Sequence, residues 1–162
     1  MAIYIFSRPI HSGKTTALLN FSIHKKNVAG ILMPDIDGSR KIYDIDKKDF
    51  FDIQCTTGHP VDEPITSVGK FHFFTRAFEK ANAIIADAIT QKPNWLIIDE
   101  VGKLELDGKG FNKAVIEAVD NYNRPDTDGN LLIVVRDSLC DAVVGYFGIT
   151  NFAIVTRLED IY

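Results

Sequence analysis

Short aliphatic runs alternate with amphipathic helical stripes along most of this chain, and this alternation restricts the fold more than any other feature. Continuous apolar runs occupy residues 2–6, 28–33, 95–98, 131–135 and 152–155. Helical spacing joins Ala77, Ala81, Ile84, Ile85 and Ala88. Strands that lack polar alternation are buried on both faces, which is typical of parallel sheets covered by helices. The sequence therefore predicts an α/β fold with a mostly parallel central sheet between two helical layers.

Other segments give shorter patterns of the same two kinds. Helices are predicted from Lys14 onward, between Phe111 and Tyr122, and after Asp137 or Ser138, either of which can cap the third helix. Their expected apolar faces are Ala17, Leu18, Phe21 and Ile23 in the first helix, Val115, Ala118 and Val119 in the second, and Leu139, Ala142, Val143 and Tyr146 in the third. Residues 41–46 and 50–53 follow a turn at Asp37 and Gly38 and predict a short antiparallel extension, and residues 71–74 predict another strand.

Composition restricts the class of protein. A chain of 162 residues with 46% apolar content has the size of one ordinary domain, so we expect a single domain over residues 1–162. A net charge of -4 provides no general attraction for nucleic acid. Cys55 and Cys140 form neither a disulfide framework nor a zinc-ligand pattern, which favours a reducing cytoplasm. We find no leader peptide or membrane-spanning run, so we expect a cytoplasmic protein that does not bind membranes; no feature specifies a protein partner.

A phosphate-binding pattern follows the first strand. The pattern G-x-x-x-x-G-K-[ST] aligns with Arg8, Pro9, Ile10, His11, Ser12, Gly13, Lys14 and Thr15, immediately before the first predicted helix. Gly13 allows the backbone to approach phosphate, Lys14 reaches the β- and γ-phosphates, and Thr15 offers a hydroxyl to Mg²⁺. Arg8 replaces the first glycine of the pattern, and His11 fills an interior position that is often small. A Gly-Lys-Thr triplet placed by chance is therefore the alternative if nothing else in the chain agrees.

Two acidic residues at the end of another strand agree with this pattern. Residues 95–98 are apolar and lead directly to Asp99 and Glu100, which is the form of a Walker B strand. In that arrangement Asp99 holds Mg²⁺ through its water shell, and Glu100 orients or deprotonates the attacking water. An enzyme that passes phosphate to a substrate hydroxyl need not supply a glutamate at this position. The pair therefore favours hydrolysis over phosphate transfer.

Residues 98–106 resemble the "DEIGKMEL" segment of the small P-loop nucleoside-triphosphatases, the family that includes the cancer-related nucleoside-triphosphatase and its thermophilic relatives. Residues 13–16 are similar to that family's "GKTT", and residues 68–71 to its "VGKY". The resemblance implies a RecA-like P-loop domain that hydrolyses ATP, GTP and other nucleoside triphosphates to diphosphate and phosphate with Mg²⁺. It also implies that Lys14 and Thr15 bind phosphate and metal, that Asp99 belongs to the metal shell and that Glu100 acts on water. The phosphate-binding loop would extend from Arg8 to Thr16.

Several other residues have two interpretations each. Arg136 follows the strand at 131–135 and can stabilise charge on the transferring phosphoryl group, or it is an ordinary surface arginine. Arg8 and His11 either contact phosphate or are simple substitutions in the loop. Lys103 and Glu105 lie in the family-like segment, and a solvated loop pair is the plain alternative. The aromatic residues at 71, 73 and 74 also have two interpretations: Phe71, Phe73 and Phe74 either stack a nucleobase or belong to the core.

Three classes of function remain in order of support. A nucleoside-triphosphatase that uses Lys14, Thr15, Asp99 and Glu100 comes first. A small phosphotransferase would share the loop, but it should carry an arginine-bearing lid and an acceptor-binding acid, and the sequence locates neither. A nucleotide-binding switch or scaffold with impaired turnover is supported by Arg8 and its neighbours at the head of the loop.

Overall fold

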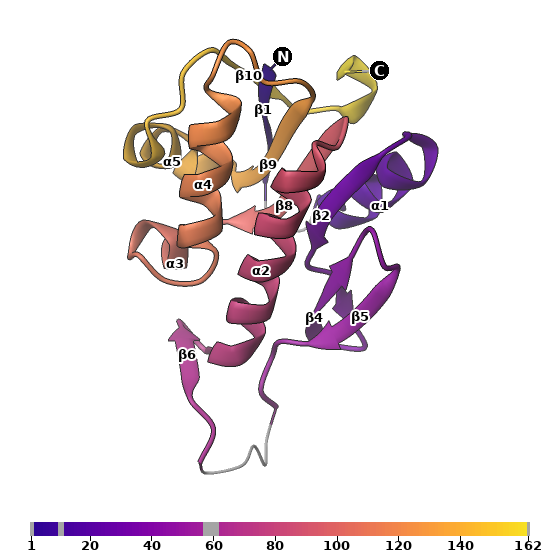
Figure 1. The fold of residues 1–162 in the computed structure, drawn as a ribbon. Helices are drawn as coiled ribbons and strands as arrows, with labels where there is room; N and C mark the ends of the chain where they lie inside the picture. The colour runs from indigo at the N-terminus through magenta and orange to yellow at the C-terminus, as the bar shows by residue number, and fades with distance from the viewer. Residues whose placement is uncertain (1, 10–11, 57–61, 162) are drawn as a thin grey trace.

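The computed structural model describes residues 2–9, 12–56 and 62–161, and it has a twisted sheet at its centre (Figure 1). The strand order is β10-β1-β9-β8-β2-β4-β3, with β5 paired to β4, and β6 and β7 form a separate hairpin. The strands are β1 (Ala2–Arg8), β2 (Val28–Leu32), β3 (Asp35–Ile36), β4 (Ser39–Asp44), β5 (Asp49–Asp52), β6 (Ile65–Val68), β7 (Phe71–Phe74), β8 (Trp95–Val101), β9 (Asn130–Arg136) and β10 (Phe152–Val155). The part from β10 to β2 is parallel, and the remainder is antiparallel.

Helices cover both faces of this sheet, because the strands are apolar on both. The helical elements are α1 (Lys14–His24), α2 (Thr75–Gln91), α3 (Lys103–Leu106), α4 (Asn112–Tyr122) and α5 (Cys140–Phe147), with 3₁₀ turns η1 (Asp137–Leu139) and η2 (Leu158–Ile161). Figure 1 shows α2 and α4 in front of the sheet, and the core on that face includes Ile98, Val115 and Ile133. The opposite face packs Ile97 and Leu132 against Leu18 of α1. The predicted mostly parallel α/β fold is therefore confirmed.

Gly30 allows β2 and β8 to pair closely. Its φ is 113°, and a Cβ at this position would collide with the carbonyl oxygen of Ile97 on β8. A side chain is therefore excluded by both the backbone conformation and the neighbouring strand. This pairing fixes the position of β8, the strand that ends in the two acidic residues.

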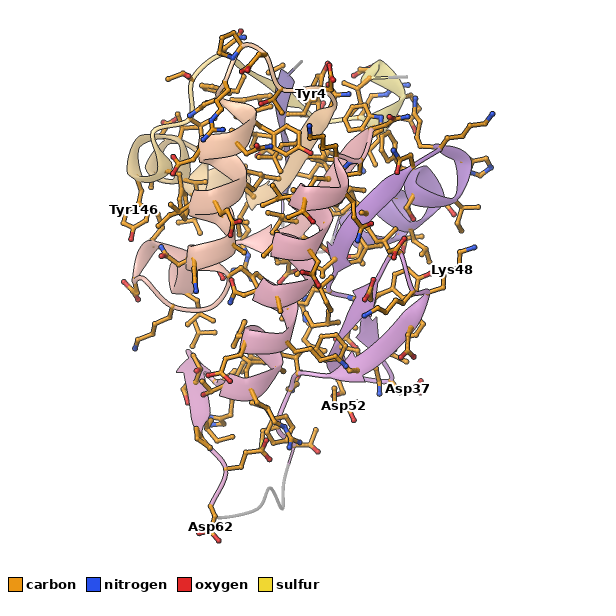
Figure 2. All side chains as sticks on the ribbon, in the orientation of Figure 1. Tyr4, Asp37, Lys48, Asp52, Asp62 and Tyr146 are labelled. Carbon is orange, nitrogen blue, oxygen red and sulfur yellow. The ribbon has the colours of Figure 1, made fainter. Side chains whose placement is uncertain are left out.

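The predicted antiparallel extension forms at the β4 edge. A two-residue turn at Asp37 and Gly38 joins β3 to β4, and residues 45–48 join β4 to β5. Figure 2 shows Asp37 and Lys48 at opposite ends of this extension. The buried carboxylate of Asp44 accepts hydrogen bonds from the Asp46 and Lys47 amides, which fixes the second turn. The extension is thereby held beside the carboxyl edge of the parallel strands.

The structure corrects several details of the predicted elements. Ile23 is 68% exposed, so it is not part of the apolar face of α1. The buried face of α5 consists of Cys140, Val143 and Phe147, whereas Ala142 and Tyr146 are exposed, and Figure 2 shows Tyr146 at the surface. Neither Asp137 nor Ser138 caps α5, because the short turn η1 precedes it. The sequence patterns also missed three short elements, β3, β6 and α3. Among the described residues, no helix is both long and apolar enough to cross a membrane.

Candidate phosphate-binding and catalytic site

The strand order brings the predicted site residues to one edge of the sheet. Strand β9 lies between β1 and β8 and is parallel to both, so their carboxyl ends point the same way. Residues just beyond these ends come from loops that are distant in sequence, and ligands of open α/β sheets bind at this edge. Lys14, Asp99 and Arg136 follow or end three different strands here. Only the order of the strands makes them neighbours.

The phosphate-binding loop joins β1 to α1 and ends at Gly13. Gly13 has a φ of 72°, and no side chain caps α1 within the described residues, so the first amides of the helix are available to an anion. Lys14 folds back over the loop, where its Nζ donates to the carbonyl oxygens of Pro9 at 2.9 Å and Arg8 at 3.2 Å. Ser12 also donates to the Pro9 carbonyl, at 2.8 Å. Residues Ile10 and His11 of the predicted loop lie outside the described residues.

A hydrogen bond joins this loop to the acidic strand. The Thr15 hydroxyl donates to Oδ2 of Asp99 at 3.1 Å, and the Met33 amide donates to the same oxygen at 3.0 Å. Asp99 is fully buried at the end of β8, between α1 and the end of β2. Thr15 and Asp99, which are 84 positions apart in sequence, are thus in direct contact. We call this pair the polar corner.

The polar corner fits a divalent cation. Burial, with a smaller contribution from the neighbouring Glu100 charge, raises the pKa of Asp99 from 3.8 to about 6, because both disfavour the ionised carboxylate. Oδ1 of Asp99 is buried and has no hydrogen-bond partner among the described residues. A buried carboxylate oxygen without a partner is costly unless a cation or its water shell meets it. Mg²⁺ takes oxygen ligands and is usually held by one or two protein groups together with phosphates, so Thr15 and Asp99 fit this ion.

Glu100 occupies a strained position on a β-bulge. The pairing of β8 with β9 shifts between Ile98 and Val101, so that Asp99 and Glu100 together oppose a single residue of β9. Glu100 has a φ of 62°, in the left-handed region that residues other than glycine avoid by about 1–2 kcal/mol. Such strain is typical of functional sites, where the surrounding structure supports it. The bulge places the Glu100 carboxylate at the edge of the sheet, where it lines the same cleft as Lys14.

Arg40 is a site residue that the sequence analysis did not identify. It extends from β4, and its Nη1 donates to Oε1 of Glu100 at 2.7 Å and to the Met33 carbonyl at 3.4 Å. Both charged side chains are less than one third exposed, at 22% and 29%, so this ion pair is partly shielded from solvent. No pattern around Arg40 distinguishes it from a surface arginine. Its position depends on the antiparallel pairing of β4 with β2.

The other two predicted arginines lie side by side at the ends of β1 and β9. Arg8 and Arg136 are register partners across the two strands. Arg136 is exposed and lines the cleft with Lys14 and Glu100. The guanidinium of Arg8 lies over the ring of Phe6, with 5.6 Å between its central carbon and the ring centroid. Arg136 is therefore placed for contact with a bound anion, and Arg8 lies beside it.

We call the opening between these groups the phosphate cleft, and its volume is about 310 Å³. Residues 12–16 form one wall, and Arg40, Glu100 and Arg136 form the other. Its remaining lining residues are Leu19, Met33, Pro34 and Asp35. The loop amides, Lys14 and two arginines outnumber the acidic groups on the cleft surface, so it is suited to a polyanion.

Glu105 is buried, contrary to the interpretation of Lys103 and Glu105 as a solvated loop pair. It is only 3% exposed, and its Oε2 and Oε1 accept hydrogen bonds from the Gly102 amide at 2.8 Å and the Phe111 amide at 2.9 Å. Burial raises its pKa from 4.5 to about 7. The solvated interpretation is therefore wrong for Glu105, which ties the two ends of the segment after Glu100 together. Lys103 is exposed.

Comparisons with known proteins agree with this arrangement. A family model described as NTPase matches residues 3–144. The chain belongs to this NTPase family. The fold of this NTPase resembles that of THEP1 from the hyperthermophile Aquifex aeolicus, with a TM-score of 0.74, 21% identity, and coverage of 100% of this chain and 97% of the other. It also resembles a human cancer-related nucleoside triphosphatase, with a TM-score of 0.66, 19% identity, and coverage of 99% and 94% respectively.

A search of curated proteins by sequence found no match. Membership of the NTPase family supports nucleoside triphosphate hydrolysis in general. At these identities the two solved structures support the fold alone. The resemblance to small P-loop nucleoside-triphosphatases, inferred from residues 98–106, is confirmed by the family model.

Proposed function

We propose that this NTPase hydrolyses nucleoside triphosphates such as ATP and GTP to diphosphate and phosphate, with Mg²⁺, in the phosphate cleft. The observation that carries the proposal is the hydrogen bond between Thr15 and Asp99, because it joins the phosphate-binding loop to the strand that ends in Glu100. Phosphate, metal and water sites of such a reaction must lie within a few ångströms of each other. This corner brings the required groups together.

Binding would begin with exchange of contacts at Lys14. Among the described residues, its ammonium group donates to the neutral carbonyl oxygens of Arg8 and Pro9. Phosphate oxygens carry more negative charge than carbonyl oxygens, so the β- and γ-phosphates are better partners for it. The amides from Gly13 to Thr16 would hold the same phosphates. A bound Mg²⁺, held by Thr15 and by the water shell at Asp99, would neutralise developing charge on the β- and γ-oxygens.

Glu100 is the proposed general base. Its Oε1 accepts a hydrogen bond from Nη1 of Arg40 at 2.7 Å, so Arg40 occupies this oxygen. A γ-phosphate in the cleft would attract Arg40 away from Glu100. Glu100 would then accept a hydrogen bond from the attacking water, while Arg40 and Arg136 would stabilise charge on the phosphoryl group. The same exchange would thus free the Glu100 oxygen and bring Arg40 to the phosphate.

The test is phosphate release from ATP or GTP by the purified protein with and without Mg²⁺. Lys14→Ala and Glu100→Gln should abolish release. Phosphate release that survives either substitution would contradict the assigned roles. Nucleotide binding without release by the unaltered protein would instead favour a nucleotide-binding switch or scaffold.

Arg40 has a matched control on its own strand. Arg40→Ala should reduce kcat by about 100-fold or more, because one charged donor to the transition state is lost. Lys41→Ala breaks a comparable ion pair, Lys41 to Asp52 at 2.6 Å, and should leave kcat unchanged. Arg40→Lys should recover activity only in part, since lysine lacks the planar fork of donors. Equal effects of the Arg40 and Lys41 substitutions would refute the role of Arg40.

A further inference from the structure

A second cavity adjoins the phosphate cleft on the side of the β6–β7 hairpin. We call it the phenylalanine cavity, and its volume is about 110 Å³. Its apolar walls come from the hairpin, α2, α3 and the start of α4, and they include Val68, Phe71, Phe73, Phe78, Leu104 and Phe111. The two cavities share Lys14, Met33, Arg40, Glu100 and Arg136 as lining residues. They therefore meet at the groups assigned to the reaction.

The direction of a bound triphosphate follows from the proposed function. Thr15 and Asp99 would hold the metal of a bound triphosphate, and Glu100, the residue next to Asp99, would then face the γ-phosphate. The nucleoside must then extend from the other end of the phosphate chain. Residues 12–13 and 15–16 of the loop line the phosphate cleft alone, whereas residues 101–105, which follow Glu100, line the phenylalanine cavity alone. The cavity therefore lies on the Glu100 side, away from the loop, and beyond the γ-phosphate. The base of the same nucleotide cannot occupy it, and this position belongs to a second molecule.

The walls and size of the cavity restrict what this molecule can be. A closed apolar cavity of about 150 Å³ accommodates benzene. The phenylalanine cavity is smaller, at about 110 Å³, but it opens into the phosphate cleft, so its size limits an occupant to a single ring. Phe71 and Phe73 stack with 6.2 Å between their ring centroids, and Phe78 meets Phe73 and Phe111 edge to face at 5.8 Å and 5.2 Å. Rings arranged in this way favour another flat, apolar ring. The polar side chains that line the cavity are those shared with the phosphate cleft, together with Lys103 and the buried Glu105, whose two oxygens accept backbone hydrogen bonds.

We propose that the phenylalanine cavity is an acceptor site for a small alcohol with a single ring, and that the protein transfers the γ-phosphoryl group to its hydroxyl. This inference rests on the proposed function, since it uses the same triphosphate site. A bond forms between the acceptor oxygen and the γ-phosphorus, and the bond from that phosphorus to the β–γ bridging oxygen breaks. The nucleoside diphosphate leaves with the electron pair, and the hydroxyl proton passes to the Glu100 carboxylate.

Glu100 would serve both reactions, because it can accept a proton from water or from an alcohol. A ring in the cavity would also exclude water from the carboxylate, so transfer would compete with hydrolysis. The sequence analysis located neither an acceptor-binding acid nor an arginine-bearing lid for a phosphotransferase. In the structure, the acid Glu100 and the arginine Arg40 both line the cavity, with 2.7 Å between Oε1 of Glu100 and Nη1 of Arg40.

The experiment uses benzyl alcohol as the acceptor probe, with ATP and Mg²⁺, and follows both products by ³¹P NMR. We expect benzyl phosphate to form alongside inorganic phosphate. Toluene has the same ring without the hydroxyl, so it should yield no phosphate ester and should suppress the formation of benzyl phosphate. Phosphate release without benzyl phosphate would overturn the acceptor site and leave hydrolysis intact. A protein that releases neither product would contradict the proposed function itself.

A matched pair of substitutions locates the reaction. Val68→Phe fills the cavity and should reduce benzyl phosphate by about tenfold or more while phosphate release persists. Ser67 is the preceding residue of β6 and is exposed, so Ser67→Phe places the same ring on the other face of the strand and should change neither product. Leu139→Phe fills the cavity from η1 and guards against a folding defect in the hairpin. Benzyl phosphate that forms equally well in both cavity-filling variants would overturn the proposal.

Discussion

The substitution Glu105→Gln tests the buried carboxylate that holds the segment after Glu100. Glu105 accepts one hydrogen bond at each oxygen, from the amides of Gly102 and Phe111, and its pKa is raised from 4.5 to about 7 by burial. The charge of Glu100 makes a smaller contribution to this rise. Glutamine keeps the shape of the side chain but cannot titrate. Its NH₂ group would face a backbone N–H, and losing that hydrogen bond should cost about 1–3 kcal/mol at every pH.

The pH dependence has a definite sign. The folded protein binds the Glu105 proton more tightly than the unfolded chain does, so stability from this group is greatest below pH 4.5 and decreases as the pH rises to about 7. At about 1.4 kcal/mol per pH unit, the decrease over this interval is about 3 kcal/mol. Above that interval both states are ionised at this position, and the contribution is constant. The unaltered protein should therefore lose its advantage over the Gln variant as the pH rises.

Urea unfolding of both proteins at a series of pH values between about 5 and 8 measures this difference. Subtracting the two free energies of unfolding cancels the groups that titrate alike in both proteins. We expect a difference that decreases up to about pH 7 and then becomes level. A difference that stays constant with pH, or one that increases with pH, would refute the assignment of a raised pKa to Glu105.

Three further substitutions probe the fold. Gly30→Ala should lower the free energy of unfolding by about 2 kcal/mol or more, because the alanine methyl group would meet the Ile97 carbonyl. Circular dichroism should show this as a reduced Tm. An unchanged Tm would contradict the close approach of β2 and β8. Phe111→Ala removes a fully buried ring and should cost about 3–5 kcal/mol in urea unfolding, and a loss below 1 kcal/mol would argue against its burial. Asp44→Ala removes the acceptor for the Asp46 and Lys47 amides and should lower the free energy of unfolding by about 1–2 kcal/mol. Amide hydrogen exchange should become faster at that turn.

The parallel core was predictable because strands that are buried on both faces appear in the sequence as uninterrupted apolar runs. Strands such as residues 95–98 and 131–135 contain no polar residue, and helical stripes such as that from Ala77 to Ala88 have a clear period. The two-residue strand β3 is too short to show a period. The helix α3 has only one turn, and its Glu105 joins the N-cap amide of Gly102 to the Phe111 amide six positions later, a contact that no helical period records.

The site was predictable only in part, for a related reason. Lys14, Thr15, Asp99 and Glu100 belong to local motifs, and the carboxyl edge of a parallel sheet is where such motifs meet. Arg40 belongs to no motif and reaches Glu100 across 60 positions of sequence. Ala142 and Tyr146 were predicted to be buried but are exposed, because helical spacing alone does not fix which face of α5 meets the sheet.

The antiparallel extension is attached to the sheet beside the polar corner. Strand β4 pairs with Ile31 and Leu32 of β2, immediately before Met33, whose amide donates to Asp99. Met33 contacts both charged groups, through its amide to Asp99 and its carbonyl to Arg40. These two contacts come from the adjacent peptide units on either side of the Met33 Cα, so a shift of the backbone at Met33 would alter the contacts of both Asp99 and Arg40. This connection gives a physical reason for the short extension in a site whose other parts all come from the parallel core.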